Sequence, residues 1–370
     1  MAVFLTSTFV RICCTISQIR QLPSSSSAPN RIIPLQNLLY TQTNPWVNKN
    51  CKLVSHHYCC KNNNIDNNID NNFKEEETST AKLRNSISMT KERKTTIMTI
   101  GNEKVIYHHY KSLSNTQDEM KRLLKEETED IVANNDIIAL TASSQGSGRG
   151  TRGRTWLGVP GNLYLTIAIP SSSVLIPITL LPLKIGTIVA NQISNFIQMQ
   201  NSKHSTPATA AKVTVKWPND ILINDLKASG ILIEYSNDYF LIGIGCNIID
   251  APNIDSAGPQ RGRKATSLNK YITSNNLSSI EKTELSKELA NLIIRDTANW
   301  ISHDSKYNPT SVDKVINDWS ALFEFGKPYI LRDETDNEVV LPIGIELDGR
   351  LKVISEKDGK EVLLVADYLF

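Results

Sequence analysis

The sequence predicts an α+β fold, in which a mixed β-sheet flanked by helices is followed by a small β-rich unit. Apolar runs of strand length alternate with segments of helical period up to about residue 323. After Gly326, short strand-like runs are separated by the turn sequences DETDNE, LDGR and KDGK. The 370 residues, 40% of them hydrophobic, suffice for one sizeable domain and a small one.

The periodicities place the expected elements in a definite order. The C-terminal runs have the spacing of a small antiparallel barrel, which we assign to residues 324–370, after a larger domain at 101–323. We expect helices at 114–132, 182–199, 281–301 and 311–323, and strands at 136–142, 162–170, 213–217, 228–236, 239–248, 328–333, 338–346, 351–357 and 360–367.

The first 65 residues differ from the rest of the chain. They contain six lysines and arginines, the run SSSS, and no aspartate or glutamate. Such a start resembles an organelle transit peptide; the alternative is a disordered tail with Met89 or Met98 as the working start. The Asn-rich tract and charged run that follow hold too little apolar surface to fold. We therefore predict residues 1–100 to be a targeting and low-complexity tail, and the location to be mitochondrial, cytoplasmic or both.

Charge and hydropathy narrow the class of partner. Residues 66–370 contain 34 of the 40 lysines and arginines and all 38 acidic residues, which gives this part of the chain a net charge of −4. This argues against nonspecific nucleic-acid binding. The longest apolar region, residues 172–186, contains two prolines and a lysine, so we expect no transmembrane span. Five of six cysteines lie in the tail, which favours a reducing compartment over a disulfide framework.

A loop rich in glycine and arginine, QGSGRGTRGRTW, separates two expected strands. Its four glycines allow the backbone to fold closely around a ligand, and its three arginines offer bidentate contacts to an anion. The spacing is that of neither a P-loop nor a dinucleotide fingerprint. The alternative is a flexible RNA-binding segment, but the flanking strands and Trp156 favour an anchored loop.

Two lysines lie close to one turn in KWPNDILINDLKASGILIE. Lys216 ends a strand, Pro218 shapes the turn, and Lys227 begins the next expected strand. Two such lysines can meet in one pocket as point charges for a phosphate or carboxylate, with Asp220 as a candidate Mg²⁺ contact; the alternative is a solvated surface turn. Gly243 and Gly245, inside a later strand, indicate close approach of another backbone or a ligand.

Four blocks in this order resemble the biotin–protein ligases, or holocarboxylase synthetases, of the biotin/lipoate ligase superfamily. The blocks are SNTQDEMKRL, QGSGRGTRGRTWLGVPGNLYL, KWPNDILINDLKASGILIE, and GIGCNI with ATSL. The resemblance extends from about Val105 to Phe370, and the third block is its most specific part. It implies a class II synthetase-like ligase core with a small C-terminal SH3-like β-barrel. Lipoate ligases, which share the fold but not KWPND, are the distant alternative.

The resemblance implies a two-step reaction. A biotin carboxylate attacks the α-phosphate of MgATP to give biotinyl-5′-AMP, and an acceptor lysine then displaces AMP. The implied substrates and cofactors are biotin, ATP and Mg²⁺, and the implied partners are the biotin carboxyl carrier domains of biotin-dependent carboxylases. The carboxylate is already a nucleophile, so this chemistry needs positive charge rather than a catalytic His or Ser.

The resemblance also assigns roles by position. Lys227, Arg149 and Lys216 are the implied catalytic residues. The implied biotin-binding residues are Asn115, Thr116, Gln117, Gln145, Arg149, Gly150, Thr151 and Lys227. The implied ATP-binding residues are Arg152, Arg154, Trp156, Lys216, Asn219, Asp220 and Asn247.

Two departures from the family pattern bear on these roles. Asn115 stands where serine is usual, and Thr151 stands where many members carry a second loop arginine; Arg152 is a candidate substitute. An Asn-rich tail, rather than a helix-turn-helix domain, precedes the ligase region, which disfavours a biotin-sensing repressor. A non-catalytic biotin-binding module would require loss of Lys216, Lys227 or Arg149, and all three are present.

Overall fold

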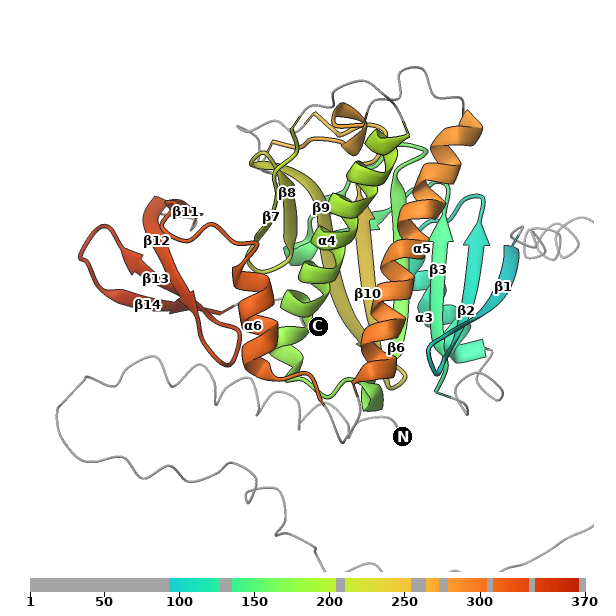
Figure 1. The fold of residues 1–370 in the computed structure, drawn as a ribbon, viewed down its shortest axis with the longest axis horizontal. Helices are drawn as coiled ribbons and strands as arrows, with labels where there is room; N and C mark the ends of the chain where they lie inside the picture. Colours follow the sequence, from blue (N-terminus) through green and yellow to red (C-terminus); the bar gives the residue numbers. More distant parts are fainter. Residues whose placement is uncertain are drawn as a thin grey trace, which may run out of the picture. The chain divides into compact units, whose positions relative to one another are not determined.

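A computed structural model describes residues 93–126, 135–203, 210–253, 264–272, 279–304, 309–332 and 337–365. The predicted tail therefore lies outside the described residues, apart from its last eight. Element labels are those of Figure 1.

An eight-stranded mixed sheet forms the centre of the larger domain (Figure 1). Its order is β1-β2-β3-β6-β10-β9-β8-β7, and β2 pairs in parallel with β3 while the other neighbours are antiparallel. The strands are β1 (Arg93–Ile100), β2 (Glu103–Tyr110), β3 (Ile137–Ala142), β6 (Leu163–Pro170), β7 (Val213–Lys216), β8 (Asp220–Ile223), β9 (Leu226–Ser236) and β10 (Tyr239–Cys246).

Helices cover both faces of this sheet. The helices α4 (Leu181–Ser202) and α5 (Ser279–His303) lie side by side on one face, with the short α6 (Val312–Ser320) beside α4, as Figure 1 shows. The helix α3 (Thr116–Glu126) packs on the opposite face against β3, β6 and β10. The two cores take alternate residues of a strand: Ile137 faces α4 and α5, whereas Ile138 faces α3. Burial on both sides explains why the central strands are almost entirely apolar.

The predicted domain boundary at residue 100 is placed too late. All eight residues of β1 pair with β2, and Met98 and Ile100 pack against the core. A translation start at Met98 would therefore remove most of an edge strand. The mixed, largely exposed sequence RKTTIMTI carries no clear alternation, which is why the strand was not expected.

Two further strands were not expected. In β2, charged and histidine residues interrupt the apolar pattern, and β8 is only four residues long. The expected hairpin between β9 and β10 is confirmed: Asn237 and Asp238 form its turn with φ of 51° and 60°. Asparagine and aspartate tolerate this left-handed conformation better than other non-glycine residues.

The C-terminal unit is a four-stranded antiparallel sheet in the order β11-β12-β13-β14, consistent with an SH3-like domain. The described strands do not close into a barrel. They are β11 (Tyr329–Arg332), β12 (Asn337–Ile345), β13 (Leu351–Ser355) and β14 (Glu361–Leu364). The Trp217 indole donates a hydrogen bond of 3.0 Å to the Gly349 carbonyl, so this sheet contacts the turn that carries the two lysines. Among the described residues, no helix has the length and apolarity needed to cross a membrane.

Candidate functional site

A cavity of about 300 Å³ opens on the α3 side of the sheet. This volume lies within the range of small-molecule sites. Its walls come from the N-terminal end of α3, the Gly/Arg loop, the turn before β8, and strands β9 and β10. Gly230, Gly243 and Gly245 lie on this face, and apolar Ile231 and Leu232 contribute to the lining. The cavity therefore combines an apolar floor with polar groups at its edges.

Asn115 caps α3. Its Oδ1 accepts hydrogen bonds from the backbone N–H groups of Gln117 and Asp118, at 2.8 and 3.2 Å, which is the geometry expected of an asparagine before the first helical turn. Its Nδ2 donates to the Ser147 carbonyl at 2.8 Å. Asparagine can thus replace the usual serine, and it also ties the helix to the Gly/Arg loop.

The next two residues of α3 are fixed by buried polar partners. Gln145 Oε1 accepts from the Thr116 backbone and hydroxyl at 2.9 and 3.2 Å, and Thr166 donates to the Thr116 hydroxyl at 2.9 Å. Gln117 Nε2 donates to the Leu232 carbonyl at 3.1 Å. These contacts hold one polar edge of the cavity in a single arrangement.

Lys227 and Asp220 form an ion pair at the other edge. Lys227 Nζ lies 2.6 Å from Asp220 Oδ1, and the two side chains are only 20% and 16% exposed. Burial alone would raise the pKa of Asp220, but the charges of Lys227 and Lys216 lower it on balance, with a smaller contribution from Arg154. Three cations therefore act on one carboxylate. We call the part of the cavity lined by Lys227, Arg154 and Asp220 the cationic corner, and it carries an excess of positive charge.

Lys216 itself does not line the cavity. Its Nζ lies 5.8 Å from the centre of the Tyr329 ring, in the C-terminal sheet. Its charge acts on Asp220 from outside the cavity wall. Asn219 does line the cavity, and its Nδ2 donates to the Ile231 carbonyl at 2.6 Å, so this amide fastens the turn to β9.

Trp156 lies in the middle of the cavity wall because two glycines make room for it. A Cβ on Gly245 would be 2.4 Å from the indole, and one on Gly230 would be 3.0 Å from it. The Lys227 ammonium is 5.5 Å from the centre of the same ring. Gly243 and Gly245, where the sequence predicts close approach of a backbone or a ligand, line the cavity, and the protein groups closest to them are the side chains of Gln117 and Trp156.

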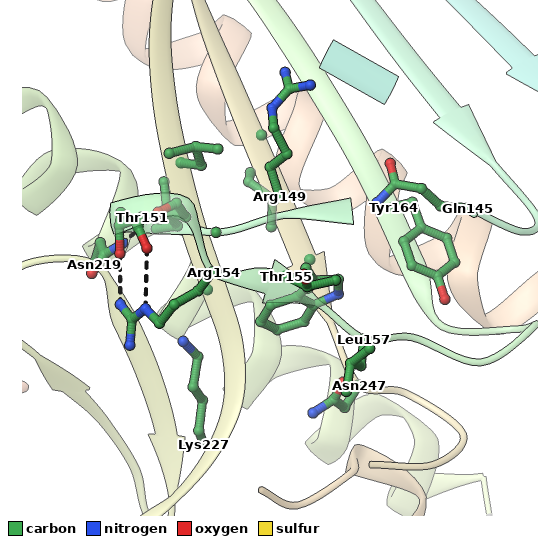
Figure 2. A pocket seen from close by; sticks show the side chains of 18 of the residues that line it. Gln145, Arg149, Thr151, Arg154, Thr155, Leu157, Tyr164, Asn219, Lys227 and Asn247 are labelled. Carbon is green, nitrogen blue, oxygen red and sulfur yellow. Dashed lines mark hydrogen bonds between the residues drawn. The ribbon is translucent and has the colours of Figure 1, made fainter. Parts of the chain in front are cut away.

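Arg149 is directed away from Lys227, as Figure 2 shows. Its guanidinium contacts Asp118 at 2.6 Å and Glu234 at 3.3 Å. The hydrogen bond to Asp118, helped by the charge of Glu234, raises the pKa of Arg149. Lys121 also contacts Glu234, at 3.1 Å. Arg149 therefore joins the Gly/Arg loop to α3 and β9.

Arg154 takes the opposite direction and approaches Lys227 (Figure 2). Its Nε and one terminal nitrogen donate to the Thr151 carbonyl and hydroxyl, at 3.1 and 2.7 Å. Gly148–Arg149 pairs with Thr155–Trp156 as a short ladder around this turn. The Arg152 side chain lies outside the described residues.

Asn247 has protein partners for both ends of its amide. It donates to the Thr266 carbonyl at 3.2 Å and accepts from Asn162 at 3.4 Å. Asn162, to which we assigned no role from the sequence, is fully buried and accepts from three successive backbone N–H groups, residues 248–250. It positions the segment after β10, and the only available signal was its place in the block GNL.

Tyr164, which lines the cavity, is a second residue without a role assigned from the sequence. Its hydroxyl donates to the Val159 carbonyl at 2.8 Å, and burial raises its pKa to about 12. A Cβ on Gly158 would be 2.1 Å from this hydroxyl. Glycine at this position thus lets Tyr164 hold the segment that follows Trp156.

The cavity contains one acidic side chain, Asp220, and that carboxylate is already ion-paired. No group of three metal-ligating side chains occurs within the described ranges. A resident Mg²⁺ site does not fit these residues; Mg²⁺ arriving with a nucleotide is held mainly by the phosphates.

The structure brings most of the predicted site residues to one cavity. Lys216 lies outside its wall, and the Arg152 side chain is not described. The predicted residues that line the cavity are Asn115, Thr116, Gln117, Gln145, Arg149, Gly150, Thr151, Arg154, Trp156, Asn219, Asp220, Lys227 and Asn247.

Part of the chain is similar to one family of known proteins. The profile of the biotin/lipoate A/B protein ligase family matches residues 112–248. A biotin–[acetyl-CoA-carboxylase] ligase of Paracoccus denitrificans is 25% identical over 62% of this chain and 88% of its own length. A ligase of the same name from Mycobacterium tuberculosis is 27% identical, over 36% of this chain and about half (52%) of its own length. The bifunctional ligase/repressor BirA of Escherichia coli is 34% identical over 30% of this chain and 32% of its own length.

Solved structures show the same similarity. The biotin protein ligase of Leishmania major in complex with biotin is 26% identical, with 71% of this chain and 98% of that chain covered and a TM-score of 0.45. The ligase of Aquifex aeolicus in complex with biotin and ATP is 22% identical, with 70% and 95% covered and a TM-score of 0.47. The profile and the sequence relatives support a biotin protein ligase in the biotin/lipoate ligase superfamily.

Proposed function

We propose that this ligase activates biotin with ATP as biotinyl-5′-AMP and transfers the biotinyl group to a lysine of a biotin carboxyl carrier domain. The observation that carries the proposal is the cationic corner at one edge of a partly apolar cavity. There Lys227 and Arg154 both line the wall, with their nitrogens directed toward each other in Figure 2, and the single carboxylate, Asp220, is ion-paired to Lys227.

The first step joins two anions, so its main obstacle is electrostatic. The biotin carboxylate oxygen forms a bond to the α-phosphorus of ATP while the bond to the pyrophosphate oxygen breaks. Lys227 lies where its ammonium can neutralise both the carboxylate and the charge that develops on the phosphate. The low exposure of Lys227 strengthens this interaction, because less water competes for the charge.

The biotin end of the cavity is supported by the helix α3 and the strand floor. Thr116, Gln117 and Gln145 hold polar groups at the cavity edge, while Ile231 and Leu232 provide apolar surface for an alkyl chain. Asn115 acts there through the position of the helix start, because both ends of its amide already have backbone partners. Trp156 supplies a flat aromatic surface between this end and the cationic corner.

The second step transfers the biotinyl group to an amine. The acceptor lysine nitrogen forms a bond to the carbonyl carbon of the mixed anhydride, AMP leaves with the bonding electron pair, and the amine gives up a proton. The Paracoccus and Mycobacterium relatives are named for an acetyl-CoA carboxylase substrate, which supports a biotin-dependent carboxylase as the acceptor.

The test combines the purified chain with biotin, MgATP and a biotin carboxyl carrier domain. We expect a mass increase of one biotinyl group on one lysine of the carrier domain, and no increase when that lysine is replaced by arginine. Lipoate in a parallel reaction separates the biotin ligase from the lipoate ligase alternative. No modification by either acid, with a carrier domain that a known ligase accepts, would refute the proposal.

A further inference from the structure

The Thr151–Arg154 contact sets this loop apart from the usual family pattern. Thr151 stands at a position where an arginine is common, and its hydroxyl and carbonyl together hold two nitrogens of the Arg154 guanidinium, at 2.7 and 3.1 Å. The backbone supports the same geometry, because the Gly150 N–H donates to the Arg154 carbonyl at 2.7 Å and the Arg154 N–H donates to the Thr151 carbonyl at 3.3 Å. The guanidinium is thus fixed at two points relative to its own loop.

The remaining donors of Arg154 are oriented towards the cationic corner. A guanidinium has five N–H groups in one plane, and the two contacts to Thr151 use only part of them. Arg154 lines the same cavity as Lys227 and Asp220, and its guanidinium lies near Lys227 in Figure 2. A planar donor beside a lysine is a suitable arrangement for two oxygens of one phosphate.

Arg149 and Arg154 differ in what neutralises them. Arg149 contacts two carboxylates, Asp118 and Glu234, outside the cationic corner. The described side-chain hydrogen bonds of Arg154 go to uncharged oxygens of Thr151. A carboxylate cancels the charge of a guanidinium, whereas a hydroxyl and a carbonyl orient it and leave the charge available. Of these two loop arginines, Arg154 is therefore the better placed to attract a nucleotide phosphate.

We propose that Thr151 is a positioning residue that holds Arg154 against the nucleotide phosphate, while Arg149 serves mainly to fasten the loop to α3 and β9. This inference rests on the proposed function, because it assumes that the cationic corner receives ATP. In this proposal, Thr151 increases the affinity for ATP by orienting Arg154 and does not affect the affinity for biotin. The chain then compensates for the missing arginine by orienting one that it retains.

The test is a pair of substitutions at one position. Thr151→Val keeps the size of the side chain and removes the hydroxyl, whereas Thr151→Ser keeps the hydroxyl. We expect Thr151→Val to raise the KM for ATP about fivefold to tenfold, since a hydrogen bond to a charged group is lost, and to leave the KM for biotin within about twofold. Thr151→Ser should restore the KM for ATP. Calorimetric titration of an ATP analogue with a non-cleavable α,β-bridge into the biotin-bound protein compares the nucleotide affinities of the variants without turnover.

Arg154→Gln tests whether the effect of Thr151 on ATP affinity depends on Arg154. If Thr151 acts through Arg154, Thr151→Val in the Arg154→Gln background should cause no further loss of ATP affinity. Additive losses, or a Thr151→Val protein that binds ATP as the original chain does, would overturn the inference while leaving the proposed function intact. Failure of the original chain to bind ATP or biotin would instead refute the proposed function itself, and the inference with it.

Discussion

Replacing Lys227 by alanine should impair both stability and catalysis, and the structure allows the two effects to be separated. The substitution leaves the Asp220 carboxylate, 16% exposed, without the ammonium that lies 2.6 Å away. Removing one partner of such a pair costs on the order of 3 kcal/mol of unfolding free energy. Most domains have about 5 to 15 kcal/mol, so we expect the variant to remain folded at room temperature.

The catalytic effect has a different origin. The Lys227 ammonium also stabilises the charge that develops when the carboxylate attacks the phosphate. Losing such a contact raises the barrier by on the order of 3 kcal/mol, which corresponds to a loss of about a hundredfold or more in rate. The assay is biotin-dependent exchange of labelled pyrophosphate into ATP, measured beside urea unfolding of the same preparation.

The double variant Lys227→Ala/Asp220→Asn is the matched control. Its neutral amide removes the uncompensated buried charge, so we expect it to recover a large part of the lost unfolding free energy. It should not recover pyrophosphate exchange, because the ammonium is still missing. A structural role alone would restore both quantities together.

The pH dependence supplies a second control. The folded-state pKa of Asp220 is lowered, so the ion pair contributes stability above the unfolded pKa of about 4, and this contribution is lost as pH falls through the folded value. Protonated Asp220 no longer needs the ammonium. The stability difference between the original chain and Lys227→Ala should therefore shrink below about pH 4.

Two results would refute this reasoning. Near-normal pyrophosphate exchange by Lys227→Ala would remove Lys227 from the chemistry. Equal unfolding free energies for the single and the double variant would show that Asp220 is not the group that the lysine stabilises.

Three further predictions concern the loop, the tail and the cavity wall. Arg149→Gly should free the loop from Asp118 and Glu234 and shorten the half-life of bound biotinyl-AMP. Amide hydrogen exchange over 146–154, with and without an adenylate analogue, measures the opening of the loop, and the half-life of the bound intermediate is measured beside it; an unchanged half-life would contradict the prediction. Removal of residues 1–92, which keeps β1 complete, should preserve pyrophosphate-exchange activity, and an inactive truncation would contradict this. A fluorescent fusion of residues 1–70 should locate at least partly in mitochondria, and a purely cytosolic signal would contradict the targeting prediction. Gly245→Ala should displace the Trp156 indole and weaken ATP binding in a folded protein, and unaltered ATP titration would show that the ring does not contribute.

The helices and central strands followed from the sequence because their cause is local. A fully buried, mostly apolar strand such as β3 and an amphipathic helix such as α3 show their burial in the order of their own residues. The edge strand β1 and the short β8 are stabilised by their neighbours instead, and their residues carry little periodic signal. The domain boundary therefore moved when the pairing of β1 became visible.

The composition of the site was likewise present in the sequence. The helix start SNTQ, the motif KWPND with Lys227, the Gly/Arg loop and the GIGCN strand pointed to the family and to most of the polar residues that line the cavity. These blocks could be found because a reaction between two anions requires lysines, arginines and close-packed glycines in a fixed chain order. Their presence does not depend on knowing how the loops fold.

The direction of each side chain was decided only by the tertiary structure. The sequence does not show the direction of either loop arginine, yet Arg149 contacts Asp118 and Glu234 from other elements while Arg154 is held by Thr151. Lys216 faces Tyr329, more than a hundred residues later in the chain. Ion pairs and packing contacts of this kind join residues that are distant in sequence, so no local pattern encodes them; they exist only once the sheet has brought its strands together.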